Sequence, residues 1–149
     1  MDATSPLLEI ERFLHEKIPL TRTMGVRVVA AGEGGFEVAA PLAVNHNHLG
    51  TGFGGSLSAL ATLAGYGLVW RELGDRDSHV VIRDSAMRYL RPVRGDLRAR
   101  CHRPGEDVLA EFRGTYFRTG RARLGLRVTI DDGGELAADF HGTYVALRM

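Results

Sequence analysis

The chain has 149 residues, the size of about one domain, and combines 44% hydrophobic with 25% charged residues. These fractions are those of an ordinary globular protein and exclude a collagen-like fibre, a coiled coil and a disordered tail. A formal net charge of +1 is too small to favour nucleic acid or an anionic membrane as a partner of the whole chain. The single cysteine, Cys101, excludes an internal disulfide, and the first residues lack a secretory signal. We therefore expect a cytoplasmic protein.

The first predicted element is a helix over residues 5–18. Ser5 supplies a capping hydroxyl, Pro6 suits the first helical position, and apolar residues recur at helical spacing until Pro19 ends the run. No linker, repeat or low-complexity tract divides the chain. We expect a single domain whose core covers about residues 20–147, with this helix as an addition at its N-terminal side.

A glycine-rich loop at residues 45–55 opens directly into an apolar helix at residues 56–73. The stretch from Leu49 to Trp70 carries no charged residue, but its glycines and serines leave an apolar part too short to cross a membrane. A helix that is apolar on most of its circumference must be covered on most sides. The sequence therefore predicts a central buried helix, with Trp70 in or near the core.

The other predicted elements are strands separated by turn residues. They span residues 25–31, 35–41, 80–90, 97–102, 108–118, 122–130 and 136–147. The connections between the last five are too short for parallel crossovers, which predicts an antiparallel sheet of five to seven strands. The fold class is α+β, with one long helix wrapped by an antiparallel sheet and an extra N-terminal helix.

Residues 50–55 read Gly-Thr-Gly-Phe-Gly-Gly and satisfy the G-x-G-x-x-G pattern of dinucleotide-binding loops. That interpretation needs a parallel βαβ unit, which the following run of strands cannot build. A second interpretation is a flexible connector. A third is that the glycines let a polar ligand approach backbone N–H groups at the helix N-terminus. Such a terminus has unpaired donors and a positive dipole end, which suit an oxyanion.

Residues 47–55, which read N-x-x-G-x-x-F-G-G, resemble the motif N-x-x-G-x-x-H-G-G of hot dog fold acyl-CoA thioesterases. Residues 87–97 resemble the strand–turn–strand that follows the central helix in these proteins. The form G-T-x-F-G-G-S-L is most similar to the thioesterase family named for the C-terminal domain of the bacterial YiiD protein. The resemblance covers roughly residues 20–147 and implies the hot dog fold.

The resemblance also implies roles for individual residues. Asn47 matches an asparagine near the attacking water. Gly54 matches the glycine whose N–H polarises the thioester carbonyl, and Gly55 permits a close approach. Phe53 stands where the family has histidine, and the family's helix carboxylate falls on Thr62. We expect Asn47, Gly54 and Thr62 to be the catalytic residues.

Thr62 has two interpretations. A threonine inside a buried helix often bonds the carbonyl one turn earlier; alternatively, its hydroxyl orients the hydrolytic water together with Asn47. Because a neutral hydroxyl is a poor base, Asp84, His46 and His48 are further candidates for the general base.

Between Arg83 and Arg127 there are twelve arginines and five acidic residues, a local net charge of +7. These arginines form either solvated strand faces or a clamp for the phosphates of coenzyme A. No further residues lie near the loop histidines at a zinc-binding spacing, so we expect no metal. The residues expected to bind substrate are His48, Phe53, Gly55, Ser58, Arg88 and Arg91.

The resemblance implies a thioesterase that hydrolyses an acyl thioester of coenzyme A or acyl carrier protein, without a cofactor beyond the coenzyme A of the substrate. It also implies a homo-oligomer, a dimer or a dimer of dimers, with the active site at the subunit boundary. Two alternatives stand beside it. One is a non-catalytic acyl-thioester binder, which the acid-free helix fits. The other is a hot dog dehydratase or hydratase, against which Phe53 and the same helix argue.

Overall fold

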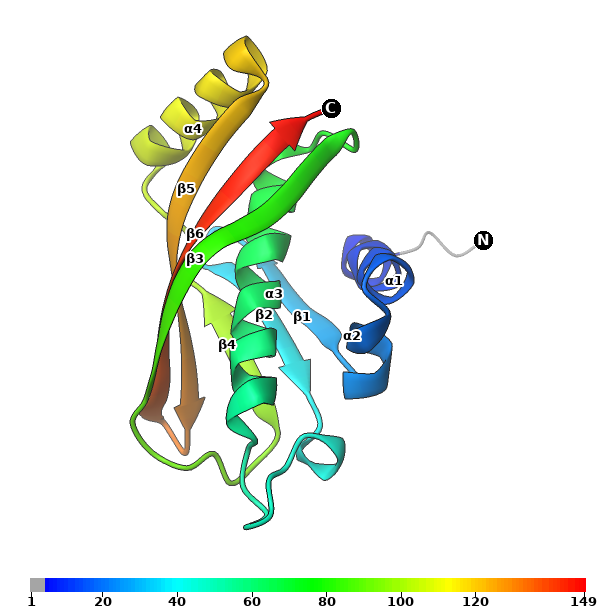
Figure 1. The fold of residues 1–149 in the computed structure, drawn as a ribbon, viewed down its shortest axis with the longest axis vertical. Coiled ribbons are helices and arrows are strands. Elements are labelled where there is room, and N and C mark those ends of the chain that lie inside the picture. The colour runs from blue at the N-terminus through cyan, green and yellow to red at the C-terminus, as the bar shows by residue number, and fades with distance from the viewer. Residues whose placement is uncertain (1–4) are drawn as a thin grey trace.

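The computed structural model describes residues 5–149, in which a six-stranded antiparallel sheet curves around one long helix (Figure 1). The elements in chain order are α1 (Pro6–Lys17), α2 (Pro19–Met24), β1 (Arg27–Gly32), β2 (Gly35–Ala40), η1 (Leu42–Val44), α3 (Gly54–Leu73), β3 (Ser78–Tyr89), β4 (Leu97–Cys101), α4 (Glu106–Thr119), β5 (Arg121–Asp132) and β6 (Glu135–Arg148). The strand order is β1-β2-β4-β5-β6-β3, with every neighbouring pair antiparallel. The predicted α+β architecture is confirmed.

The N-terminal helix begins where the sequence predicts. Ser5 Oγ accepts a hydrogen bond from the N–H of Leu7 at 3.2 Å, and Pro6 occupies the first helical position. This helix ends before Pro19, as expected, but Pro19 then begins a second helix, α2, which the sequence analysis did not predict. A proline at the first position of a helix lacks only an N–H that would have no intrahelical partner. Helix α2 then ends at Gly25, whose φ of 72° is left-handed.

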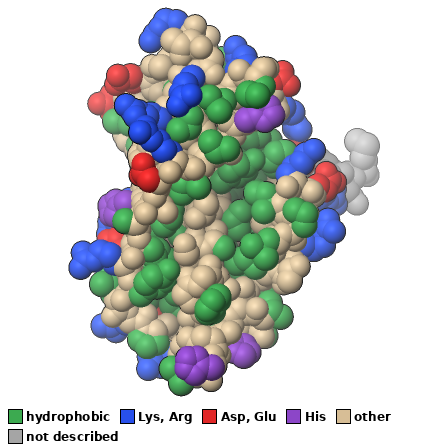
Figure 2. All heavy atoms as spheres, in the orientation of Figure 1, with side chains coloured by type: hydrophobic (Ala, Val, Ile, Leu, Met, Phe, Trp, Pro, Cys, Tyr) green, Lys and Arg blue, Asp and Glu red, His purple; other side chains and the backbone are tan. Residues whose placement is uncertain are grey.

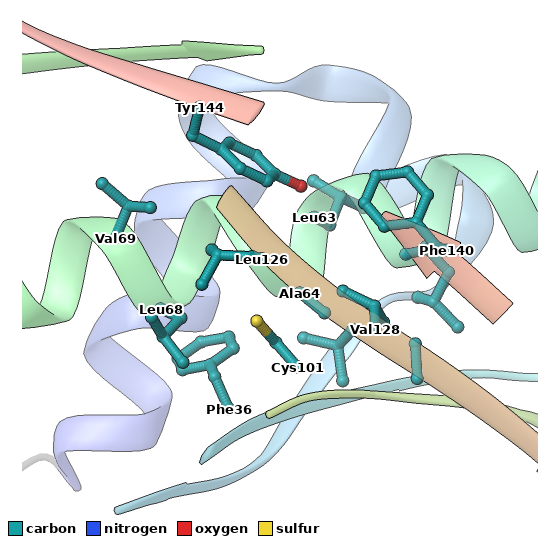
Figure 3. Close-up of a cluster of buried hydrophobic side chains, with 14 of the residues drawn as sticks. Phe36, Leu63, Ala64, Leu68, Val69, Cys101, Leu126, Val128, Phe140 and Tyr144 are labelled. Atoms are coloured by element: carbon teal, nitrogen blue, oxygen red, sulfur yellow. The ribbon is translucent and has the colours of Figure 1, made fainter. Parts of the chain in front are cut away.

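Helix α3 forms the centre of the core, and ten of its 20 residues are buried, which confirms the predicted central helix. Gly65 and Gly67 allow two aromatic rings to press against it. A Cβ atom at Gly65 would lie 2.2 Å from Tyr144 Oη, and one at Gly67 would lie 2.2 Å from Phe36 Cε1. Figure 3 shows Tyr144 and Phe36 packed beside α3 within the buried cluster. Trp70 packs against this core, as predicted.

Residues 108–118, predicted as a strand, form most of helix α4 instead. Its buried residues, Leu109, Phe112 and Tyr116, follow at spacings of three and four, which is the period of a helix face. Gly120 ends the helix with a φ of 78°. The aromatic content of this segment suits a strand, but the spacing of its buried residues decides for a helix.

Among the helices of residues 5–149, none has the length and apolar character needed to cross a bilayer.

Helix α4 closes the end of the core that lies far from the glycine-rich loop (Figure 1). Strand β4 pairs with β5 only at residues 128–130, so α4 lies beside the part of β5 that β4 does not reach. Tyr116 Oη donates to Asp75 Oδ2 at 2.9 Å, just beyond the C-terminus of α3. Arg113 Nη1 donates to Glu72 Oε1 at 3.1 Å. These contacts fasten α4 to the C-terminal end of α3.

Within residues 5–149, one strand edge and one helix face stay uncovered. The edge strand β3 pairs there only with β6. On α3, the half-buried residues Ala59, Thr62 and Tyr66 recur at helical spacing and define one uncovered face, which ends at Trp70, whose ring stacks on Phe13 of α1 at 4.6 Å. Figure 2 shows hydrophobic side chains gathered along α3, between β3 and α1.

Candidate active site

The loop that leads into α3 is anchored by Asn45, which is 2% exposed. Its Nδ2 donates to the carbonyls of Met24 at 2.9 Å and Pro41 at 2.8 Å. Its own carbonyl accepts from the N–H of Phe53 at 2.8 Å. The sequence analysis assigned no role to Asn45, because its bond to Met24, 21 positions earlier in the chain, forms only in the fold.

Asn47 organises the tip of the same loop. Its Oδ1 accepts from the N–H groups of Leu49 at 2.9 Å and Thr51 at 3.1 Å. Its Nδ2 donates to Thr51 Oγ1 at 2.9 Å. Both ends of the amide therefore hold loop residues in place, beside the N-terminus of α3.

The N-terminus of α3 has free hydrogen-bond donors. Phe53 occupies the N-cap position and offers no side-chain acceptor. Within residues 5–149, the N–H groups of Gly54, Gly55 and Ser56 donate to no acceptor, and the first bonded N–H is that of Leu57. These free donors lie at the positive end of the dipole of a 20-residue helix. The arrangement is suited to an oxyanion, as the third interpretation of the glycine-rich loop proposed.

Two half-exposed aromatic rings bracket these donors. Tyr89 Oη donates to the carbonyl of Gly54 at 3.2 Å, and its ring lies 3.5 Å from where a Gly54 Cβ would be. The Phe53 ring lies 2.5 Å from where a Gly55 Cβ would be, so a side chain at position 55 would displace this half-exposed ring. Tyr89 was not among the predicted site residues, because only the fold brings it to Gly54, 35 positions earlier in the chain.

A surface groove of about 460 Å³ runs along this end of α3. The polar and aromatic residues that line it, together with the donor glycine, are Asn47, Thr51, Gly54, Tyr89 and Arg91. A second depression adjoins it at Asn47 and is lined by His46, His48 and Phe53. The structure therefore brings most of the predicted loop residues to one end of the molecule, around the free N–H groups.

Comparison with known proteins agrees with this geometry. The family described as "Putative thioesterase (yiiD_Cterm)" matches residues 7–148, nearly the whole chain. The chain belongs to this family. Membership supports thioesterase activity, the hydrolysis of a thioester bond, as its general reaction.

Solved structures resemble the chain over its whole length. A protein described as a "putative thioesterase" from Shewanella oneidensis is 31% identical, over 95% of this chain and 96% of that one, with a TM-score of 0.81. A protein of unknown function from Chlorobaculum tepidum TLS is 29% identical, over 95% and 94%, with a TM-score of 0.90. A "probable thioesterase" from Pseudomonas aeruginosa is 24% identical, over 97% of each chain, with a TM-score of 0.82, and shows the fold alone. The sheet wrapped around α3 is thus the hot dog fold of this thioesterase family, as the sequence predicts.

Thr62 lies outside the groove. It follows Gly54 by eight residues, which places it about 12 Å further along the helix axis. Its Oγ1 donates to the carbonyl of Ser58 at 2.9 Å, the bond expected of a threonine inside a helix. The lone pairs of Oγ1 are still able to accept a hydrogen bond from water. Within one chain, Thr62 and Asn47 do not converge on one pocket.

The two arginines predicted to bind substrate lie at different places in the structure. Arg91 lines the groove and forms an ion pair with Glu135. Arg88 lies opposite Asp139 in the β3–β6 register. Because the alternate residue Phe140 points into the core, Asp139 and Arg88 face outward. Arg91 is therefore at the groove, and Arg88 is on the other face of the sheet.

The candidate bases separate in the same way. Asp84 pairs in register with Thr143, on the outward face of the sheet, so the sheet separates it from the groove of its own chain. His46 and His48 lie at the loop, and His46 Nδ1 is 2.8 Å from the carbonyl oxygen of Asn47. Of the three candidates, only the two histidines belong to the end of the molecule that holds the free donors.

Proposed function

We propose that the chain hydrolyses an acyl thioester of coenzyme A or acyl carrier protein in the groove at the N-terminus of α3. The observation that carries this proposal is the set of three free N–H groups beside the groove. Attack of water on a thioester carbonyl converts its oxygen into an oxyanion, which such fixed donors stabilise. We assign the oxyanion to the N–H of Gly54, with Gly55 permitting the close approach.

Neighbouring side chains complete this assignment. Asn47 is a positioning residue in the proposed site, because its amide is occupied in holding the loop. Tyr89 carries an O–H donor at the helix end, and we place it as the donor to the sulfur when the C–S bond breaks. Residues 39–71 contain no carboxylate, so the attacking water has no acidic residue of this helix as its base. Hydrolysis is therefore expected to be slow near neutral pH and faster in alkali, where hydroxide is available without a base.

The proposed active site is shared between two copies of the chain. The support is the uncovered face of α3, the unpaired edge of β3, and the position of Thr62 on that face, about 12 Å along the helix from Gly54. In a dimer whose α3 helices pack antiparallel across this face, the Thr62 hydroxyl of one chain comes toward the groove of the other. Ser58, one turn earlier, lies at the same boundary. A dimer or dimer of dimers follows from this arrangement.

The proposed substrates share a phosphate-bearing pantetheine arm, and they differ in what that arm is attached to. Arg91 is the arginine that lines the groove, next to the loop that contains His48 and Phe53. We place the arm along this side, with the thioester carbonyl at the helix N-terminus. An arginine at the mouth suits a phosphate of either carrier.

One substitution isolates the oxyanion donor. Gly54 is the first helical residue, where proline is tolerated, and Phe53 before it has an extended ψ of 130° that proline permits. Gly54→Pro thus removes the N–H and keeps the helix. Gly54→Ala is the matched control, because its Cβ meets Tyr89 at an ordinary distance of 3.5 Å.

The assay is release of free thiol from a panel of acyl-CoA and acyl carrier protein thioesters. We expect Gly54→Pro to lose a factor of about 10²–10³ in kcat, and Gly54→Ala to lose much less. Equal turnover in Gly54→Pro and the parent chain contradicts the oxyanion assignment. Tight binding of thioesters without any thiol release by the parent chain identifies a non-catalytic binder instead.

A further inference from the structure

A second groove, of about 580 Å³, lies between α4 and the outer side of β5. It is at the C-terminal end of α3, whereas the proposed active site is at the N-terminal end (Figure 1). The 20 residues of α3 separate the two ends by roughly 30 Å. Nothing in the proposed hydrolysis uses this second groove.

The lining of the groove combines an apolar floor with a charged rim. The apolar residues are Val108, Phe112, Ala122, Leu124 and Val145, of which Val108 is exposed and the other four are buried. The polar residues are Arg83, Arg121, Arg123, Glu111 and Thr115. Small-molecule sites have this general construction, an apolar surface with a few placed polar groups, and volumes of about 300–1,000 Å³.

The local geometry of two strands brings the three arginines together. On β5, Arg121 and Arg123 alternate with buried residues and so share the outward face of the sheet. On β3, a bulge between Ile82 and Asp84 inserts Arg83 as an extra residue. Strand β6 lies between β5 and β3 and contributes Val145 to the floor. Figure 2 shows Lys and Arg side chains gathered near this end of β3.

The positive charge of these arginines is poorly neutralised. Within residues 5–149, Arg121 and Arg123 form no ion pair. Arg83 Nε is 3.9 Å from Asp84 Oδ2, and both side chains are more than half exposed, so this contact is weak. Arg127, further along β5, is by contrast paired with Asp139 at 3.0 Å. The local excess of positive charge in the sequence is therefore left available at this groove.

We propose that the groove binds a nucleoside phosphate. Three guanidinium groups carry more positive charge than a ligand with a single carboxylate would neutralise. The planar fork of arginine also matches the oxygens of phosphate groups. Val108, which is 46% exposed, offers an apolar surface to the flat base, with Phe112 and Val145 beneath it. Glu111, on the α4 side of the groove, accepts hydrogen bonds from a ribose hydroxyl or a base amino group. Binding at this groove is independent of the thioesterase activity.

The test is calorimetric titration of the full chain with adenosine 3′,5′-bisphosphate, inorganic pyrophosphate, decanoate and a single-stranded oligonucleotide. We expect the bisphosphate to bind most tightly, and its binding to weaken as salt is raised. The double variant Arg121→Gln/Arg123→Gln should weaken that binding by at least about tenfold. The matched control, Arg12→Gln/Arg27→Gln, removes the same charge from exposed arginines on α1 and β1 and should bind as the parent chain does.

A second variant tests the groove by another route. Val108 is 46% exposed, so Val108→Glu adds a carboxylate to the groove without opening the core. This variant should also weaken the binding of the bisphosphate. Equal losses in the groove and control pairs, or no binding by the parent chain, overturn the proposal. Tighter binding of decanoate, sensitive to Arg121 and Arg123, overturns it in favour of an acyl carboxylate site. Tighter binding of a single-stranded oligonucleotide overturns it in favour of nucleic acid.

Discussion

At the scale of single residues, Asn47 determines the shape of the loop that leads to the free N–H groups. Its Oδ1 accepts two backbone N–H groups, and its Nδ2 donates to Thr51 Oγ1. The two ends of the amide can be tested separately, because aspartate keeps the acceptor and loses the donor. Alanine removes both.

We expect kcat for thioester hydrolysis to fall in the order parent, Asn47→Asp, Asn47→Ala, with the alanine variant more than about tenfold slower. The loop lies at the surface, so unfolding free energies should change by only about 1 kcal/mol. Steady-state kinetics and urea unfolding of the same preparations provide both measurements. Full activity in Asn47→Ala would contradict a positioning role.

Thr62 gives the second prediction at this scale. Thr62→Val keeps the volume and removes the hydroxyl that donates to the carbonyl of Ser58. If Oγ1 orients water in the groove of a partner subunit, kcat falls while KM for the thioester is nearly unchanged. Thr62→Asp restores the carboxylate of the broader family pattern and should raise kcat. A Thr62→Val variant that folds and keeps full turnover shows that the hydroxyl serves only the helix.

At the scale of elements, the packing of α3 depends on how closely the sheet approaches it. Phe36, on β2, is 1% exposed, and its ring fills the space where a side chain at Gly67 would begin. Because the ring is enclosed, it cannot move aside without disturbing the surrounding core.

We therefore predict that Gly67→Ala destabilises the fold by about 1–3 kcal/mol through overpacking, despite the better helix propensity of alanine. Gly114→Ala is the control, because Gly114 lies exposed in α4 with nothing within 4 Å of an added Cβ. That variant should be more stable by about 0.5–1 kcal/mol. Urea unfolding measures both; the same sign of change in the two variants would refute the packing argument.

At the scale of the whole molecule, the uncovered face of α3 predicts self-association. Ala59 is half-buried on that face, so Ala59→Glu would bury a charge at the proposed interface. Sedimentation should show a dimer or larger oligomer for the parent chain and a monomer with reduced thiol release for Ala59→Glu. Ala30→Glu, at an exposed position on β1, should leave both properties unchanged. A parent chain that is monomeric at all concentrations would contradict the shared site.

The stability of the whole molecule also depends on pH. Partial burial, together with the charges of Arg100 and Arg127, lowers the pKa of His102 below the ordinary value of 6.5. The unfolded chain then binds a proton at a higher pH than the folded chain does, so this contribution to stability is lost as the pH falls below neutral. We expect the Tm to fall between about pH 7 and pH 5. The fall should be smaller in His102→Gln, and an identical pH dependence in that variant would contradict the assignment.

Local sequence patterns were sufficient to predict the elements that depend on the apolar surface of one helix or on a single capping residue. The apolar circumference of residues 56–73 predicted a covered helix, and Ser5-Pro6 located the start of α1. Residues 108–118 were predicted wrongly, because aromatic and branched residues suggested a strand before their burial was known. Which of Leu109, Phe112 and their neighbours are buried depends on where α4 meets α3 and β5, and no local pattern contains that information.

By itself, the sequence determined the fold class, the central helix, the thioesterase resemblance and the glycines at the helix N-terminus. Only the tertiary structure decided that Tyr89 reaches Gly54, that Asn45 anchors the loop, and that Arg88 faces away from the groove that Arg91 lines. Periodicity and capping act over a few residues, and a sequence displays them directly. A functional site forms where distant segments of the chain meet. The register of the sheet and its curvature around α3 determine which segments meet.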